Sequence, residues 1–111
     1  MNRDARIGMN EAVFRSVNER IQEVANAFQL TAEPLDLICE CGDANCVERI
    51  TMTPAEYEEL RSNSHYFAVA PGHEAEDVEA VVAKRDRYDI VAKNTGVPEA
   101  IAEETDPRRG G

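Results

Sequence analysis

Three cysteines lie within eight residues of one another, and this cluster constrains the chain more than any other feature of its sequence. Cys39, Cys41 and Cys46 form the pattern C-x-C-x4-C. Disulfide frameworks of secreted domains use an even number of cysteines spread along the chain, so an odd, compact group indicates a metal site or a redox site instead. The pattern therefore predicts a tight turn that brings three thiols together.

Zinc is the metal that suits this donor set best. It takes four thiolate or imidazole ligands in a tetrahedron, at about 2.0 to 2.3 Å. Gly42 permits a sharp bend between the second and third cysteines, and Asp43 favours a turn. We therefore predict that the three cysteines are ligands of a structural zinc ion. Binding such an ion would also help to fold a chain of only 111 residues that contains no Trp.

Three thiolates leave one ligand position open, and the chain has only two histidines to fill it. His73 follows Pro71 and Gly72, a turn that can project a side chain from the end of a strand. His65 comes where a helix is expected to end, and a histidine there can interact with the negative end of the helix dipole. His73 is therefore the predicted fourth metal ligand, and His65 is the alternative.

A redox role is the main alternative for the cluster. A thiol-based redox sensor would use Cys39, Cys41 and Cys46, although their spacing differs from the C-x-x-C of thioredoxin-like enzymes. The three residues could also be incidental buried thiols. Iron–sulfur ligation is disfavoured because it usually needs a fourth cysteine.

The sequence does not favour an enzyme. It lacks the zinc deaminase signature, the H-E-x-x-H motif and a glycine-rich phosphate loop. Glu40, Glu48 and Glu74 lie close to the predicted ligands and are interpreted as surface carboxylates. We therefore expect a zinc-stabilised protein-binding or regulatory module without catalytic residues.

The charge balance limits the partners of such a module. The chain has 12 basic and 22 acidic residues, a net charge of −10. This argues against nucleic-acid binding through phosphate contacts, and it favours a protein partner with a basic surface. No apolar run is long enough to span a bilayer, and the first residues lack the apolar region of a signal peptide. The expected location is the cytoplasm, with no membrane contact.

Apolar residues recur at helical spacing near the start of the chain. They are Val13, Val17, Ile21, Val24 and Phe28. Their separations of four, four, three and four residues predict an amphipathic helix over residues 10–29, with Asn10 as its N-cap. The apolar face of this helix is expected to pack on the rest of the fold.

Five strands and a second helix are predicted downstream. The strands are expected at residues 35–38, 47–52, 66–70, 78–84 and 88–92. Thr53 and Glu56 form a capping box with Pro54 at the first helical position, so a short helix should run over residues 54–62. The cysteines then lie in the turn between the first two strands, and the last two strands form a hairpin.

The predicted architecture is α+β, with a long N-terminal helix packed on a small, mainly antiparallel sheet and a cysteine-bearing hairpin turn. Residues 10–93 are expected to form a single zinc-binding domain, preceded by a flexible N-terminus at 1–9 and followed by a disordered C-terminal tail at 94–111. The end at Gly110 and Gly111 is similar to that of ubiquitin-like modifiers, but their fold starts with a hairpin rather than a helix.

Three stretches carry a further resemblance. NEAVFRSVNERI, CECGDANCVERITMTPAEYEELR and FAVAPGHE occur in this order between residues 10 and 93. Together they resemble a group of small uncharacterised bacterial proteins that share the C-x-C-x4-C and P-G-H-E motifs. The resemblance implies a self-contained domain, and it implies no activity and no catalytic residues.

Overall fold

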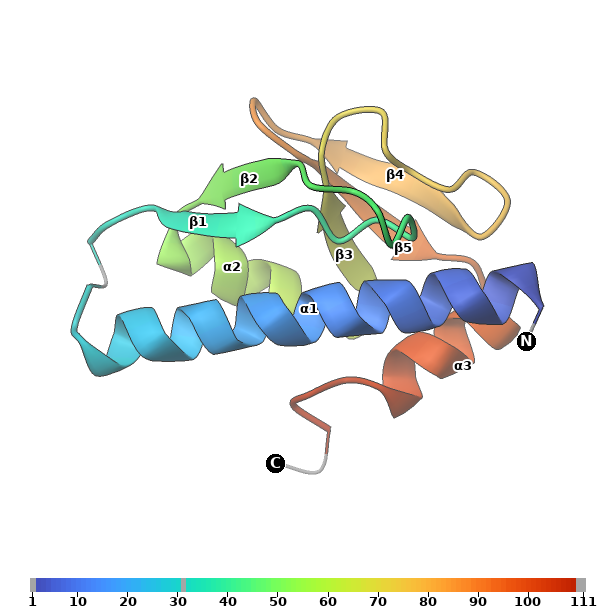
Figure 1. The fold of residues 1–111 in the computed structure, drawn as a ribbon, viewed down its shortest axis with the longest axis horizontal. Helices are drawn as coiled ribbons and strands as arrows, with labels where there is room; N and C mark the ends of the chain where they lie inside the picture. The colour runs from blue at the N-terminus through green and yellow to red at the C-terminus, as the bar shows by residue number, and fades with distance from the viewer. Residues whose placement is uncertain (1, 31, 110–111) are drawn as a thin grey trace.

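Over the residues that the structure describes, the fold consists of a long helix, two short helices and two small antiparallel sheets (Figure 1). The computed structural model describes residues 2–30 and 32–109. Its elements in chain order are α1 (Arg3–Ala27), β1 (Leu35–Ile38), β2 (Arg49–Met52), α2 (Pro54–Arg61), β3 (Tyr66–Val69), β4 (Glu79–Lys84), β5 (Asp89–Lys93) and α3 (Val97–Glu104). The α+β architecture predicted from the sequence is therefore confirmed.

Both sheets are antiparallel throughout. β1 pairs with β2 so that Leu35 lies opposite Met52 and Ile38 lies opposite Arg49. The second sheet has the order β3-β5-β4, and β4 and β5 are consecutive in the chain and form the expected hairpin. The long connection between β1 and β2 carries the cysteines, and Figure 1 shows it reaching toward the second sheet.

The short helix α2 begins as its capping box predicts. The Thr53 side chain accepts a hydrogen bond from the Glu56 amide, and the Glu56 side chain accepts one from the Thr53 amide. This satisfies two amides that the first turn of a helix leaves without partners. Among the helices of residues 2–30 and 32–109, none combines the length and apolar character that crossing a bilayer requires.

The apolar core lies between the sheets and the helices. It consists of β-branched, leucine and aromatic side chains together with two of the cysteines. Its largest members are Leu35, Leu37, Cys39, Cys41, Ile50, Met52, Tyr57, Leu60, Phe67, Val69, Tyr88 and Val91. Helix α3 contributes Ala102 to the same cluster. One core therefore unites both sheets. Burial of apolar surface in such a core stabilises the folded state by roughly 25 cal/mol per Å².

Helix α1 differs from its prediction at its start and in the face that it buries. It begins at Arg3 rather than Asn10, and Asn2 is its N-cap. Most of the predicted apolar face is exposed: Val13, Val17, Val24 and Phe28 point to solvent, and only Ile21 packs partly against the core. The prediction that this face packs on the fold was therefore wrong.

The face that α1 buries carries several polar side chains, which find partners inside the protein. The Asn18 side chain accepts a hydrogen bond from the Ile38 amide and donates one to the Ile38 carbonyl, with distances of 2.9 and 2.8 Å. The Arg15 guanidinium lies over the Phe67 ring, 4.7 Å from its centroid, and bonds the Ala102 carbonyl at 2.9 Å. Buried polar groups of this kind are stable only when they are hydrogen-bonded.

A buried ionic cluster joins α1 to the second sheet. The Lys93 ammonium lies 2.5 Å from a Glu11 oxygen and 3.0 Å from a Glu79 oxygen, and all three side chains are at most 1 % exposed. Burial, together with the adjacent Glu79, raises the pKa of Glu11 to about 9. One cation and two carboxylates thus share a site that is neutral when Glu11 keeps its proton.

The C-terminal segment also differs from its prediction. Residues 97–104 form α3 instead of belonging to a disordered tail, and α3 packs on α1 where Gly8 approaches Ile101 closely. Arg108 then binds Glu58 and Glu19, with distances of 2.8 and 2.9 Å. Buried Arg15 fixes the end of α3, so a segment with few apolar residues is still held in place. The terminal glycines lie outside the described residues.

Candidate metal centre

The connection between β1 and β2 is a structured loop that carries all three cysteines. The Cys39 amide donates to the Glu48 carbonyl at 3.0 Å, which continues the pairing of β1 with β2 by one step. A turn then forms where the Cys46 amide donates to the Asp43 carbonyl at 3.0 Å. Cys39 and Cys41 are buried, whereas Cys46 is half-buried. The loop therefore turns its thiols toward the protein interior.

His73 reaches the same place from the turn that follows β3. Its amide donates to the Ala70 carbonyl at 2.9 Å, and Gly72 has a φ of 84°. Pro71 followed by a glycine with positive φ is typical of a type II turn, and a residue with a Cβ is strained in that backbone conformation. The turn that the sequence predicts here projects the His73 ring onto the cysteine loop.

The four side chains form one compact group of potential metal ligands. One donor atom from each of Cys39, Cys41, Cys46 and His73 lies within 4.8 Å of every other. The His73 Nδ1 atom lies 3.7 Å from Cys39 Sγ and 3.6 Å from Cys46 Sγ. Ligands at zinc–sulfur and zinc–nitrogen distances in a tetrahedron lie roughly 3.6 Å apart. The two sulfur–nitrogen distances are therefore those expected of ligands on one tetrahedral ion, and the other pairs of donor atoms lie within 4.8 Å.

Glu40, the residue between the first two cysteines, anchors the loop to the protein interior. Its carboxylate is fully buried and accepts hydrogen bonds from the Arg61 guanidinium, from the Asn18 amide group and from the Ala68 backbone amide. In extended chain, adjacent side chains point to opposite sides, so the cysteines on either side of Glu40 point the other way. The interpretation of Glu40 as a surface carboxylate was wrong, whereas Glu48 is exposed as expected.

Helix α1 holds the other side of the loop. The Asn10 side chain donates to the Gly42 carbonyl at 2.8 Å. A Cβ on Gly42 would lie 2.4 Å from Cγ2 of Ile7, so only glycine allows the loop to lie this close to the helix. The chain bends at Gly42, as expected, although the φ of this glycine is not positive. Close approach to α1 is therefore the reason that the position needs a glycine.

The thiols influence one another strongly. A hydrogen bond from Cys39 lowers the pKa of Cys41 to about 5, and the Asp43 amide contributes further. The same contact with Cys41, together with burial, raises the pKa of Cys39. The Ala70 amide also donates to Cys39 Sγ at 3.1 Å, a contact that stabilises negative charge on this sulfur. The pocket therefore offers donors to thiolates, the form in which cysteine binds metals.

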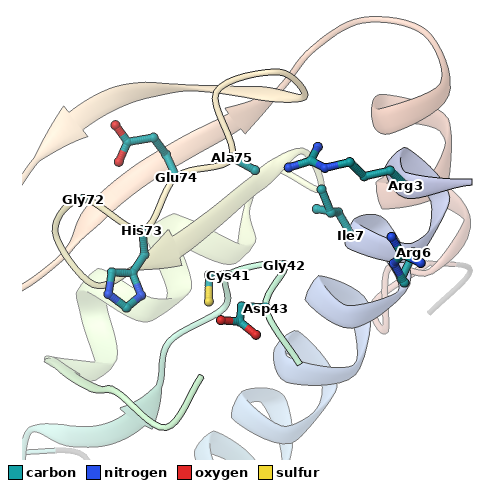
Figure 2. Close-up of a pocket in the computed structure, with 10 residues that line it drawn as sticks. All are labelled: Arg3, Arg6, Ile7, Cys41, Gly42, Asp43, Gly72, His73, Glu74 and Ala75. Carbon is teal, nitrogen blue, oxygen red and sulfur yellow. The ribbon is translucent and has the colours of Figure 1, made fainter. Parts of the chain in front are cut away.

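A cavity of about 530 Å³ adjoins this group (Figure 2). Cys41 and His73 line one side of it, and Arg3 and Arg6 from the first turns of α1 line the other. Arg3 forms an ion pair with Asp77 in the loop before β4, which ties the start of α1 to this region. The lining of the cavity contains basic and acidic side chains, because Asp43 and Glu74 also belong to it.

His65 lies elsewhere and has different partners. Its Nε2 atom lies 2.8 Å from a Glu103 oxygen, and its Nδ1 atom lies 3.8 Å from a Glu99 oxygen. These three residues are a second group with ligand-type atoms close together. The group connects α3 to the segment before β3, so the structure gives His65 a role in packing these two parts of the chain.

The structure thus brings Cys39, Cys41, Cys46 and His73 together and leaves His65 outside the group. Sequence reasoning missed the supporting side chains, although the alternation of side chains along C-E-C was a signal that the middle residue points inward. No family model, no curated protein and no solved structure matches this chain.

Proposed function

We propose that the three cysteines and His73 bind one zinc ion, which clamps the loop between β1 and β2 to the turn after β3. The observation that carries this proposal is the closeness of the four donor atoms, with two sulfur–nitrogen distances of 3.7 and 3.6 Å. Three thiolates and one imidazole form a donor set typical of structural zinc. The clamp joins segments that are 27 residues apart in the chain at Cys46 and His73.

The clamp has a structural role in this proposal. Structural zinc sites use four protein ligands, whereas catalytic zinc keeps a position for water or substrate. In this proposal, side chains of the chain supply all four ligands, and buried hydrogen bonds anchor the Glu40 carboxylate between two of them. We therefore assign no catalytic residue and expect no enzymatic activity.

The function that fits this clamp is that of a small zinc-stabilised protein-binding or regulatory module in the cytoplasm. Support comes from the charge of the chain, a net −10, much of it on exposed side chains. Asp36, Asp43 and Glu48 are exposed beside or within the cysteine loop. A rigid loop with this charge suits a protein partner with a basic surface, and it disfavours nucleic-acid phosphates.

Zinc content and thermal unfolding test the clamp. Protein purified without a metal-chelating resin should contain close to one equivalent of zinc, and chelation should lower its midpoint of thermal unfolding by about 10 °C or more. His73→Ala should weaken zinc retention, whereas the control His65→Ala should retain zinc like the original chain. Zinc far below one equivalent, with no loss of stability on chelation, would contradict the proposal.

The binding role has its own test. Immobilised zinc-loaded protein should capture a protein partner with a basic surface, and capture should weaken at high salt because the charges are then screened. Replacing Asp36 and Glu48 by Asn and Gln should reduce capture without changing zinc content. Absence of any partner, together with measurable turnover of a small molecule, would contradict a binding module and favour an enzyme.

The closeness of the three sulfur atoms favours one second candidate, a thiol-based redox sensor. Two of the thiols would lose two protons and two electrons to an oxidant such as hydrogen peroxide and form a disulfide, which a dithiol would reduce again. Mass spectrometry of the zinc-containing protein after mild peroxide treatment distinguishes the two. Rapid release of zinc, with a metal-free chain that is lighter than the fully reduced chain by two hydrogen atoms and regains them on treatment with a dithiol, supports the sensor. A zinc-containing protein of unchanged mass supports the clamp.

A further inference from the structure

Helix α1 and its C-cap residue expose a mainly apolar strip along one face. Its positions follow one another at intervals of three or four residues, which places them on one side of a helix. The α1 strip consists of Arg6, Met9, Val13, Val17, Arg20, Val24 and Phe28. Its five apolar members are exposed by 41 to 73 %. Such a face on a stable helix indicates an interaction surface, because the opposite face already holds α1 in the fold.

The apolar members of the strip are arranged symmetrically along the helix. Met9 and Phe28 are equally far from the point between residues 18 and 19, and so are Val13 and Val24. An antiparallel second helix with the same sequence would therefore place its Phe28 opposite Met9 and its Val24 opposite Val13. A surface that complements itself in this way is what a two-fold symmetric interface requires.

We propose that two copies of this chain associate through the α1 strip as an antiparallel helix pair. The same symmetry places Val17 opposite Arg20 of the second copy, whose aliphatic stem can cover the valine while its charged end stays in water. The Arg20 guanidinium already has an anionic neighbour, Glu23, 3.6 Å away on the same helix. The centre of the pair therefore contains no isolated charge.

Charge also fits this arrangement. Two copies with a net charge of −10 repel each other. The strip contains none of the 22 acidic residues of the chain, so this repulsion is weaker when the two copies approach through the strip. The first two turns of α1 carry Arg3 and Arg6, and its last turn has no basic residue. Antiparallel pairing brings Arg6 of each copy toward the last turn of the other, where backbone carbonyls favour a cation.

The size of the strip sets the expected strength of the dimer. A helix of 25 residues is about 37 Å long, and one face of it covers less than the roughly 800 Å² per partner of a standard interface. The dimer should therefore dissociate reversibly, with a dissociation constant of about micromolar order. The four proposed metal ligands come from the loops after β1 and β3, and none of them belongs to the strip, although Arg6 of the strip also lines the cavity beside them.

Sedimentation equilibrium of the full chain over a concentration series tests the proposal. The expected result is a reversible equilibrium of monomer and dimer that shifts toward dimer at high salt, because salt screens the repulsion between acidic surfaces. The double variant Val13→Glu/Val24→Glu should remain monomeric. The control Val82→Glu/Val97→Glu changes two valines of similar exposure, 50 and 58 %, outside the strip and should dimerise like the original chain.

Two readouts separate a lost interface from a lost fold. The Val13→Glu/Val24→Glu protein should have the same zinc content as the original chain. Its midpoint of thermal unfolding should equal that of the original chain at concentrations at which the original chain is monomeric. A mixture of Met9→Cys and Phe28→Cys chains should cross-link mainly between the two variants, as antiparallel pairing requires. A chain that is monomeric at every concentration, a double variant that still dimerises, or cross-linking mainly between two Met9→Cys chains would each overturn the proposal. The proposal of a zinc site does not depend on any of these results.

Discussion

Glu40 and Arg61 form a two-point ion pair beneath the cysteine loop, with Nη1 of Arg61 3.0 Å from Oε2 of Glu40 and Nη2 2.8 Å from Oε1. The two side chains are exposed by no more than 2 %. Because Glu40 lies between Cys39 and Cys41, this pair fixes the backbone from which two of the proposed zinc ligands extend. The position of the thiols thus depends on a side chain of α2.

Replacing Arg61 by Met should destabilise the protein strongly. The substitution leaves the Glu40 carboxylate buried without its cation, which typically costs about 3–5 kcal/mol of unfolding free energy. Zinc affinity should fall as well. The matched control is Arg49→Met, because the pair of Arg49 with Asp36 is 3.0 Å long but exposed, and exposed pairs contribute less than about 1 kcal/mol. Equal losses in the two variants, measured by denaturant unfolding, would contradict this account of Glu40.

Gly42→Ala should push the cysteine loop away from α1. The new Cβ would lie 2.4 Å from Cγ2 of Ile7, and overpacking of this kind costs about 1–3 kcal/mol. The additional change Ile7→Ala removes the opposing atom, so the effects of the two substitutions should be far from additive. In contrast, a Cβ on Gly72 meets open space, and only its φ of 84° opposes alanine. Additive effects at Gly42 and Ile7 in a double-mutant cycle would rule out the proposed clash.

The buried carboxylate of Glu11 should make stability depend on pH. Its pKa rises from 4.5 to about 9 on folding, so the folded protein holds a proton that the unfolded chain releases between these values. The stability contributed by this proton is complete below the lower value and is lost as pH rises through the higher one, on the order of 1 kcal/mol per pH unit.

Glu11→Gln isolates this effect, because glutamine has the same shape and cannot ionise. Unfolding free energies measured from pH 4.5 to 9 should fall less steeply for Glu11→Gln than for the original chain, and the two proteins should differ most at the alkaline end. Glu59→Gln, at an exposed position of α2, serves as the control and should leave the slope unchanged. Parallel curves for Glu11→Gln and the original chain would show that Glu11 is ionised in the fold.

Much of the fold is predictable from local sequence. The capping box at Thr53 fixes the start of α2, and β-branched alternation locates β2, β4 and β5 within a few residues. These signals depend on neighbouring residues, so one sequence is enough to recognise them. The cysteine spacing and the Pro71-Gly72 turn likewise pointed to the group of side chains that the structure brings together.

The packing of α1 was not predictable in the same way. Apolar periodicity indicates which face of a helix avoids water, but it does not say whether that face meets the core of its own chain or another surface. The buried face can hold Glu11, Arg15 and Asn18 because these side chains find partners on β5, α3 and β1, far away in sequence. Similarly, α3 depends on Arg15 and on contacts with α1, which composition alone does not reveal.

The most direct test of the central claim is X-ray absorption at the zinc edge of the purified protein. The account predicts three sulfur neighbours at about 2.3 Å and one nitrogen at about 2.0–2.1 Å. In the His73→Ala protein, any zinc that remains should keep its three sulfur neighbours and lose the imidazole signal, which His65→Ala should preserve. A first shell with fewer than three sulfur atoms, or one in which imidazole scattering survives in His73→Ala, would contradict the metal centre proposed for this protein.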